Sequence, residues 1–297
     1  MKKIIFGLIF IALVSGTFSA FAQINLGQPA NQSVIIKIDE KGNAHITHVV
    51  QPSKNAQQLS VINNDYTNLQ ITTQDGEAAQ YGTTGGEKAG FLIFPTNQNV
   101  LVDYDLENAV TKADAWWLWN YLYQASTTFY LPEKVNLVFV NGNPINLGMA
   151  DGIKCHGCQV KLEYQIDKTE TLKQIQWEDK KFDVRLITTA KISSFAFDQP
   201  NKKIVFDTDN ANEYVTLVIP KELLSNPYQV LLNNKKLLKH EFYSDDTNIW
   251  LNVKPNATGT VEVIGTSVIP EFPITAILVL ATSLILATRY SHKFNLR

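Results

Sequence analysis

Polar and apolar residues alternate along much of the chain, which is the pattern of strands buried on one side. SVIIKID (33–39) alternates, EKGN (40–43) supplies a turn, and AHITHVV (44–50) alternates again, so this region predicts a β-hairpin. Further short stretches bounded by turns follow at LSVI, NLQITTQ, AGFLIFP and NVLVDYDLE. Short strands at this spacing predict an all-β protein made of sandwich or barrel sheets.

Two histidines, His45 and His48, lie in the second strand of that hairpin. Because strand side chains alternate between faces, residues three apart are expected on opposite sides and are poor candidates to share a metal ion. Asp103, Asp105 and Glu107 alternate along one later strand, where carboxylates usually solvate an edge strand. They are weak evidence for the acid and base of a glycosidase.

The segment WWLWNYLY (116–123) is the most aromatic part of the chain. As a strand, it places Trp117 and Trp119 on one face with two tyrosines, and Trp116 and two leucines on the other. Apolar side chains on both faces predict an interior strand of a sandwich. The alternative is that Trp117 and Trp119 form an exposed stacking platform for carbohydrate.

The second half of the chain continues the strand pattern. VNLVFVNGNPINL predicts two strands around an Asn-Gly turn, and TETLKQIQWEDKK is a charged segment that fits a linker or a charged edge strand. We therefore expect two β-sandwich-like domains in series, residues 23–167 and 168–268. The second would hold the strands around VTLVIP, YQVLLNN, NIWLNV and GTVEVIGT.

Cys155 and Cys158 are the two cysteines and flank His156 and Gly157. In an exported protein, a pair this close is most simply a local disulfide or two neighbouring thiols. A redox pair is less favoured because a strand follows, whereas a helix N-terminus would lower the thiol pKa. Copper or zinc held by both cysteines and His156 remains open, although the spacing supplies no complete ligand set.

Two further surface features are candidate sites. Asp207, Asp209, Asn212 and Glu213 place oxygen ligands in one loop region and could hold calcium, although a solvated loop is the favoured explanation because the glycine and glutamate of an EF-hand are absent. The sequons at Asn31 and Asn256 are candidates for glycosylation.

The N-terminus has the order of an export signal. Lys2 and Lys3 precede an apolar stretch, and Ala20-Phe21-Ala22 is an A-x-A cleavage site, so residues 1–22 are predicted to be a signal peptide. Residues 272–288 carry no charge and reach the lower limit of roughly 17–25 residues for a membrane helix. The basic residues after them predict a cytoplasmic C-terminus and an external ectodomain.

The junction before that apolar segment carries a resemblance. Pro270, Glu271, Phe272 and Pro273, followed by the apolar segment and a basic tail (269–297), resemble the PEF-type C-terminal sorting signals of archaeal surface proteins. The resemblance implies recognition by an archaeosortase and anchoring at the cell surface. IPKELLSNPYQVLLNN and VEVIGTSVIPEFP resemble the β-sandwich domains that precede such signals, which implies architecture but no activity.

Charge and motifs restrict the function classes. The formal net charge of −2 is unlike that of a nucleic-acid-binding protein, and the sequence has no G-x-S-x-G, H-E-x-x-H or phosphate loop. We expect a non-catalytic structural or adhesive envelope protein, with other envelope proteins or glycans as partners. A metal-binding or redox protein and a carbohydrate-binding module are the alternatives.

Overall fold

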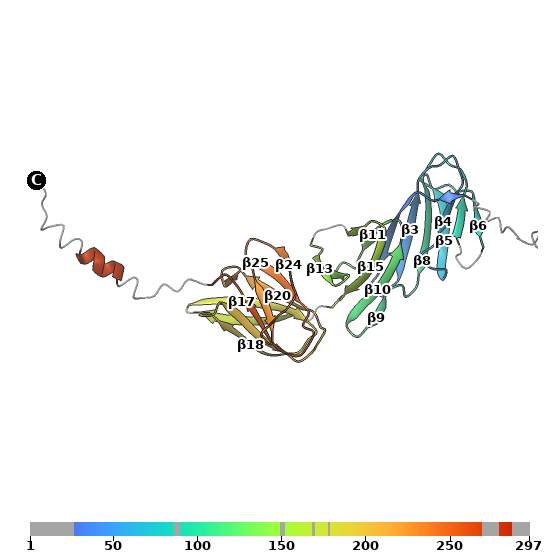
Figure 1. The fold of residues 1–297 in the computed structure, drawn as a ribbon. Helices are drawn as coiled ribbons and strands as arrows, with labels where there is room; N and C mark the ends of the chain where they lie inside the picture. The colour runs from blue at the N-terminus through green and yellow to red at the C-terminus, as the bar shows by residue number, and fades with distance from the viewer. Residues whose placement is uncertain are drawn as a thin grey trace, which may run out of the picture. The chain divides into compact units, whose positions relative to one another are not determined.

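The computed structural model describes residues 27–85, 90–148, 152–167, 170–177, 179–268 and 279–286, and it is mostly β, with several antiparallel sheets and one short helix in these ranges (Figure 1). The described residues of that helix are 279–286. Within the described ranges, no helix is long and apolar enough to cross a membrane. The predicted signal peptide and the motif Pro270-Glu271-Phe272-Pro273 lie outside the described residues, as does most of the predicted membrane segment.

The described residues divide into two compact units that interleave along the chain. Unit 1 holds the residues up to Ala109 together with Tyr123–Tyr130 and Lys154–Cys158. Unit 2 holds Val110–Leu122, Leu131–Ile153 and the residues from Gln159 onward. The predicted boundary between residues 167 and 168 stays a prediction.

Unit 1 is built around two sheets. The four-stranded sheet has the order β1 (Gln28–Pro29), β4 (Gln57–Ser60), β7 (Gly90–Ile93), β6 (Tyr81–Thr84). The six-stranded sheet has the order β14 (Ile153–Cys155), β11 (Ser126–Tyr130), β2 (Gln32–Ile38), β3 (Ala44–Val50), β8 (Val100–Leu106), β5 (Tyr66–Thr73). β1 pairs with β4 and β11 with β2 in parallel, whereas the pairs β2–β3, β3–β8, β5–β8, β4–β7 and β6–β7 are antiparallel.

The predicted hairpin of unit 1 is confirmed by the antiparallel pairing of β2 with β3. Asp39 fixes the turn, because its Oδ1 accepts hydrogen bonds of 2.8 Å from the amides of Lys41 and Asn43. Gly42 takes a φ of +85°, which favours glycine. Alternation then sends Ile36 and Ile46 into the core, where both are fully buried.

Unit 2 contains three five-stranded sheets and one small ribbon. The first has the order β13 (Asn143–Asn146), β12 (Leu137–Val140), β15 (Cys158–Tyr164), β10 (Trp116–Tyr123), β9 (Thr111–Ala113). The second has the order β16 (Glu170–Trp177), β17 (Lys180–Thr188), β20 (Val215–Pro220), β25 (Asn248–Val253), β24 (Lys239–Ser244). The third has the order β18 (Ile192–Asp198), β19 (Lys203–Thr208), β26 (Gly259–Ile264), β22 (Gln229–Leu232), β23 (Lys235–Lys236), and β21 (Leu224–Ser225) pairs with β27 (Ser267–Val268).

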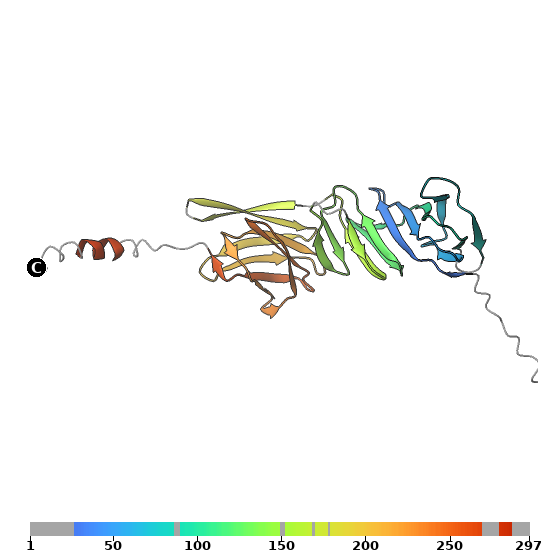
Figure 2. The same ribbon diagram turned by 90° about the horizontal axis from the view of Figure 1, so that it is seen from above.

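The main core of unit 2 forms between its second and third sheets. Leu186 and Leu217 from the second sheet and Phe206 and Val263 from the third belong to one buried cluster. The charged segment TETLKQIQWEDKK contains β16, the edge strand that forms a long hairpin with β17 (Figure 2). Of the two alternatives for this segment, the structure shows the edge strand.

The aromatic strand β10 differs from its prediction in one respect. It lies inside a sheet, between β15 and β9, as an interior strand should. Trp119 and Tyr121 are buried, but Asn120 and Leu122 are exposed, and Leu122 is 73% exposed. The expectation of two buried faces is therefore wrong for this half of the strand, because within the described ranges no second layer covers the side that carries Asn120 and Leu122.

Candidate functional site

A row of side chains crosses the outer face of the six-stranded sheet in unit 1. Strand register places Tyr130 on β11 beside Lys37 on β2, Lys37 beside His45 on β3, and His45 beside Asp105 on β8. Thr67 on β5 follows Asp105. We call these five residues the outer row. They share one face because register-paired residues on neighbouring strands point the same way.

His45 lies between two carboxylates of β8. Its Nδ1 is 2.7 Å from Asp105 Oδ1, and its Nε2 is 3.5 Å from Asp103 Oδ1. Thr47 donates a 2.6 Å hydrogen bond to Asp103. Because the His45 side chain is 46% exposed, solvent screens these contacts, and they add little stability. The predicted alternation of the carboxylates on one face is what brings both of them to the histidine.

A β-bulge brings one more polar group to Asp105. The register between β5 and β8 shifts between Thr67 and Gln70, and Asn68 in this interval has a φ of +55°. Its amide donates a 2.7 Å hydrogen bond to Asp105 Oδ2. This bond, followed by the bond from His45, lowers the pKa of Asp105, which is therefore ionised at neutral pH.

The end of this face is hollowed into a groove of about 450 Å³. Its lining includes Lys37, Asn43, His45, Asn68 and Asp105. A positive charge, carboxylates and amides thus face one volume, whose size lies in the range of about 300–1,000 Å³ found for small-molecule sites. The lining offers hydrogen-bond donors and acceptors together, in an arrangement suited to a polar ligand.

The inner face of the same strand carries a chain of buried hydrogen bonds around His48. Tyr104 Oη accepts from the amide of Ile62 (3.0 Å) and donates to His48 Nε2 (2.9 Å). His48 Nδ1 donates to Gln32 Oε1 (2.7 Å). Gln32 Nε2 then donates to Tyr123 Oη (2.9 Å). We call Gln32, His48, Tyr104 and Tyr123 the buried relay.

Both ends of the buried relay are attached to backbone. Tyr123 Oη donates a 2.5 Å hydrogen bond to the carbonyl of Ser60, the last residue of β4, and the other end of the relay is held at Ile62, in the segment that joins β4 to β5. Burial lowers the pKa of His48 to about 3 and raises that of Tyr123 to about 12. The relay is therefore neutral at pH 7, and both nitrogens of His48 are engaged inside the protein.

The cysteine turn lies between β14 and β15. Cys155 is disulfide-bonded, and the chain has one other cysteine, Cys158. Gly157 has a φ of +60°, and His156 is exposed in the turn. In the ranges that the structure describes, no group of three or more His, Cys, Asp or Glu residues has the geometry of a metal site.

The two tryptophans considered for carbohydrate do not form an open platform. Trp119 is only 9% exposed and packs edge-on against Tyr121, with ring centroids 5.4 Å apart. Trp117 is half-buried, and Lys112 Nζ lies 5.5 Å from its ring centroid. Little of the Trp119 ring surface is accessible for stacking on a sugar.

The four calcium candidates each have contacts of their own. Asp207 accepts 2.6 Å hydrogen bonds from Ser194 and Thr260, and these lower its pKa. Ser193 and Lys191 contact Asp209, Thr189 donates to Glu213, and the amide of Asn212 donates to the carbonyl of Pro255. Their contacts tie them to several different segments of unit 2.

The two sequons differ in their surroundings. Asn31 is exposed, but Gln32 belongs to the buried relay and Ser33 is paired within the six-stranded sheet. Asn256, Ala257 and Thr258 are all exposed in the bend between β25 and β26. Asn256 is therefore the more accessible of the two candidates.

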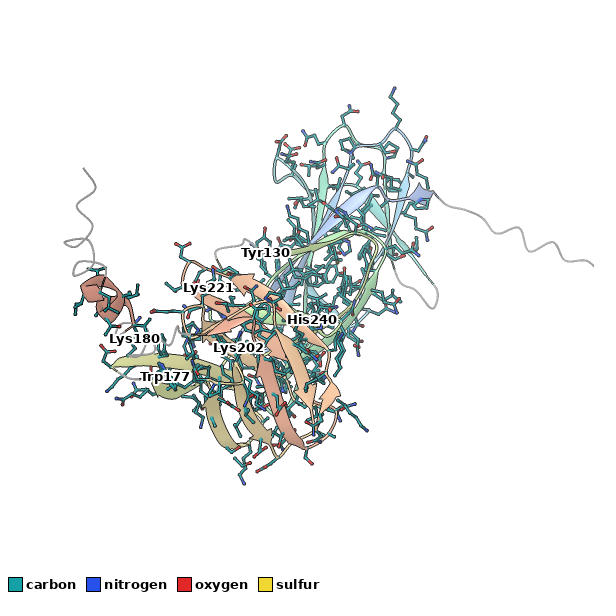
Figure 3. The ribbon with its side chains drawn as sticks, turned by 60° about the vertical axis from the view of Figure 1, so that its left-hand side comes forward. Tyr130, Trp177, Lys180, Lys202, Lys221 and His240 are labelled. Atoms are coloured by element: carbon teal, nitrogen blue, oxygen red, sulfur yellow. The ribbon has the colours of Figure 1, made fainter. Side chains whose placement is uncertain are left out.

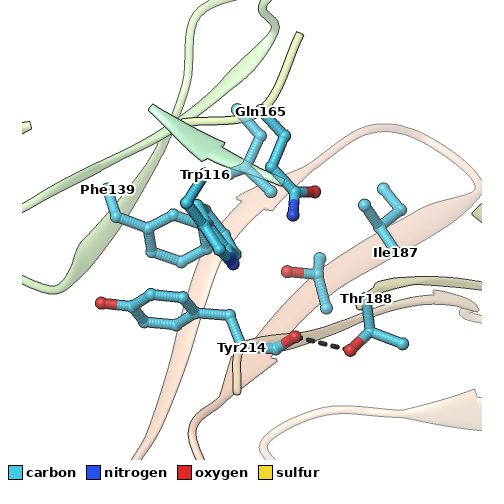
Figure 4. A pocket seen from close by; sticks show the side chains of 8 residues that line it. Trp116, Phe139, Gln165, Ile187, Thr188 and Tyr214 are labelled. Carbon is cyan, nitrogen blue, oxygen red and sulfur yellow. Dashed lines mark hydrogen bonds between the residues drawn. The ribbon is translucent and has the colours of Figure 1, made fainter. Parts of the chain in front are cut away.

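Unit 2 has its own aromatic cluster around Tyr214. Its ring stacks on Phe139 at 3.8 Å between centroids and meets the edge of Trp116 at 5.4 Å. Lys254 Nζ lies 4.0 Å from the ring centroid, and Tyr214 Oη donates to Glu163 at 3.1 Å. Burial, followed by the Glu163 charge, raises the pKa of Tyr214. Figure 4 shows Trp116, Phe139 and Tyr214 around a small cavity of about 20 Å³, which Gln165 also lines.

Sequence reasoning missed the buried relay and the groove. Gln32 and Tyr123 are 91 residues apart, and His48 and Tyr104 are 56 apart. The one usable signal was His48 itself, a polar residue at an inward position of an alternating strand. Comparison with known proteins gives no further guide, since no protein-family model and no curated protein matches the chain.

Proposed function

We propose that this chain is an exported protein, anchored at the cell surface, with a non-catalytic structural or adhesive role in the envelope. Its ectodomain would consist of two β-sandwich-like domains in series, preceded by the signal peptide (1–22) and followed by the PEF-type sorting signal (269–297). The several antiparallel sheets support this architecture, and the terminal sequence patterns support the destination.

The disulfide at Cys155 carries the proposal of export. Disulfides persist in oxidising compartments outside the cytosol, and in cytosolic proteins they are rare and mostly transient. The export signal and the sorting motif, which were identified from other parts of the chain, point to the same compartment.

The state of the buried histidine supports a non-catalytic role. A general base needs a lone pair that a substrate can reach. His48 Nε2 accepts from Tyr104 and Nδ1 donates to Gln32, so the relay uses both ring nitrogens. These hydrogen bonds serve to position the segment between β4 and β5.

The test is to express the full chain in an archaeal host and to follow its location and mass. We expect external protease to digest the ectodomain on intact cells, the mature N-terminus to be Gln23, and the mass to be lower than the reduced value by two hydrogens. Glu271→Ala should cause an unprocessed form to accumulate, whereas Glu262→Ala, in β26, is the matched control and should be sorted normally. A full-length protein protected inside intact cells would contradict the proposal.

A further inference from the structure

We propose that the outer row and the groove beside it bind a saccharide. The proposal rests on the adhesive role proposed above and names the class of ligand, and it places the binding surface on unit 1 instead of on the tryptophans of β10. The bound species is a neutral sugar unit whose hydroxyl groups reach the polar lining, because Asp39, Asp105 and Glu107 outnumber Lys37 there.

The groove has the hydrogen-bonding capacity that a sugar requires. A carboxylate accepts up to about four hydrogen bonds. Asp105, which lines the groove, accepts two from side chains. This carboxylate is thus held in place by protein contacts and can still accept from hydroxyl donors. Lys37 and Asn43, which also line the groove, add donors.

The positions of these groups are fixed before a ligand arrives. Asp105 is held from both sides, by His45 on β3 and by Asn68 in the bulge of β5. Groups on paired strands lose little conformational freedom on binding, which favours affinity for a small polar ligand. The bulge is what directs Asn68 toward Asp105, an effect that bulges often have near binding sites.

The outer row also supplies an aromatic ring. Tyr130, labelled in Figure 3, is 37% exposed and is register-paired with Lys37, so its ring shares the face with the polar residues. An exposed ring beside hydrogen-bonding side chains suits a sugar, which has apolar C–H surfaces as well as hydroxyl groups. Tyr130 offers this more readily than Trp119, which is buried.

The lining is less suited to a metal ion. Lys37 places an ammonium group among the carboxylates, and His45 Nδ1 already shares a hydrogen bond with Asp105. These two features weaken the attraction of the groove for a divalent cation, which prefers oxygen ligands without a neighbouring positive charge.

The experiment uses the purified full chain on an array of oligosaccharides of hexoses, N-acetylhexosamines and uronic acids, followed by titration calorimetry with the best-retained oligosaccharide. We expect retention without added calcium. Tyr130→Ala and Asp105→Asn should each weaken binding by about tenfold or more. Tyr130→Phe, which keeps the ring, should bind within a few-fold of the original chain.

Control variants separate lost binding from lost folding and from lost localisation. Asp183→Asn changes a strand carboxylate of unit 2 that accepts one hydrogen bond from Gln174 and should leave binding unchanged. Hydrogen exchange of β3 should be the same in all variants. Three outcomes would overturn the proposal. The array retains no oligosaccharide, it retains one only when calcium is added, or binding is lost in Trp117→Phe but kept in Tyr130→Ala. Location of the chain at the cell surface is measured in a separate experiment, so a failure of localisation does not change how the binding result is interpreted.

Discussion

The outer row and the buried relay share strand β3 but differ in exposure and in the charge of their partners. His45 is half-exposed beside two carboxylates, whereas His48 is fully buried among neutral partners. Solvent screens the outer contacts, and burial strengthens the inner ones. Two histidines three residues apart therefore have different roles, one on a surface open to ligands and one in the stability of the fold.

The largest expected effect is the acid sensitivity that His48 confers. Its pKa is about 3 in the folded protein and about 6.5 when unfolded, so below pH 6.5 the unfolded chain takes up a proton that the folded chain does not. Stability should fall between pH 6.5 and 3 by up to about 5 kcal/mol from this group and level off below. Hydrogen exchange of β3 and β8 should show this loss in the original chain but not in His48→Leu. Parallel pH profiles would contradict it.

The second-largest expected effect is the difference in stability between variants of the two histidines at pH 7. His48→Ala removes a buried ring and the hydrogen bonds that His48 makes to Gln32 and Tyr104. We therefore expect a loss of about 3–5 kcal/mol in the free energy of unfolding. The matched change His45→Ala should alter it by less than about 0.5–1 kcal/mol. Chemical denaturation gives the free energy of unfolding of both variants, and hydrogen exchange in β3 checks it. Equal losses of stability in His48→Ala and His45→Ala would show that the distinction between the two faces is wrong.

A smaller effect is expected at the end of the buried relay. Tyr123→Phe removes the hydroxyl between Gln32 and the carbonyl of Ser60 and should cost about 1–3 kcal/mol. Amides between β4 and β5 should exchange faster because this attachment is lost. Tyr130→Phe removes a hydroxyl from the outer row and serves as the control. Unchanged exchange in Tyr123→Phe would argue against the relay as the anchor of this segment.

The smallest effect concerns Asp105. The hydrogen bond from Asn68 is the main cause of its lowered pKa, so Asn68→Ala should move this pKa upward, toward 3.8. Because the folded pKa is lowered, the stability from Asp105 is present above pH 3.8 and is lost as the pH falls below it. Carboxyl NMR titration measures the shift. Asn43→Ala is the control. An equal pKa shift of Asp105 in Asn43→Ala would show that the hydrogen bond from Asn68 is not the main cause of the lowered pKa.

Local patterns predicted the strands of both units well. The hairpin of β2 and β3 follows from alternation and a glycine turn, and the turn between β12 and β13 follows from Asn141-Gly142, whose φ angles of +51° and +80° suit that pair of residues. Opposite faces for His45 and His48 were also predicted correctly, because the period of a strand is two.

The sequence by itself determined which residues point the same way along each strand, because alternation, turn residues and strand length are local properties. Only the tertiary structure decided which strands became neighbours. It set the buried relay and the outer row, whose members come from strands far apart in sequence, and it left Leu122 uncovered on β10. The physical reason is that sheet order depends on long-range packing and loop closure, which no local pattern records.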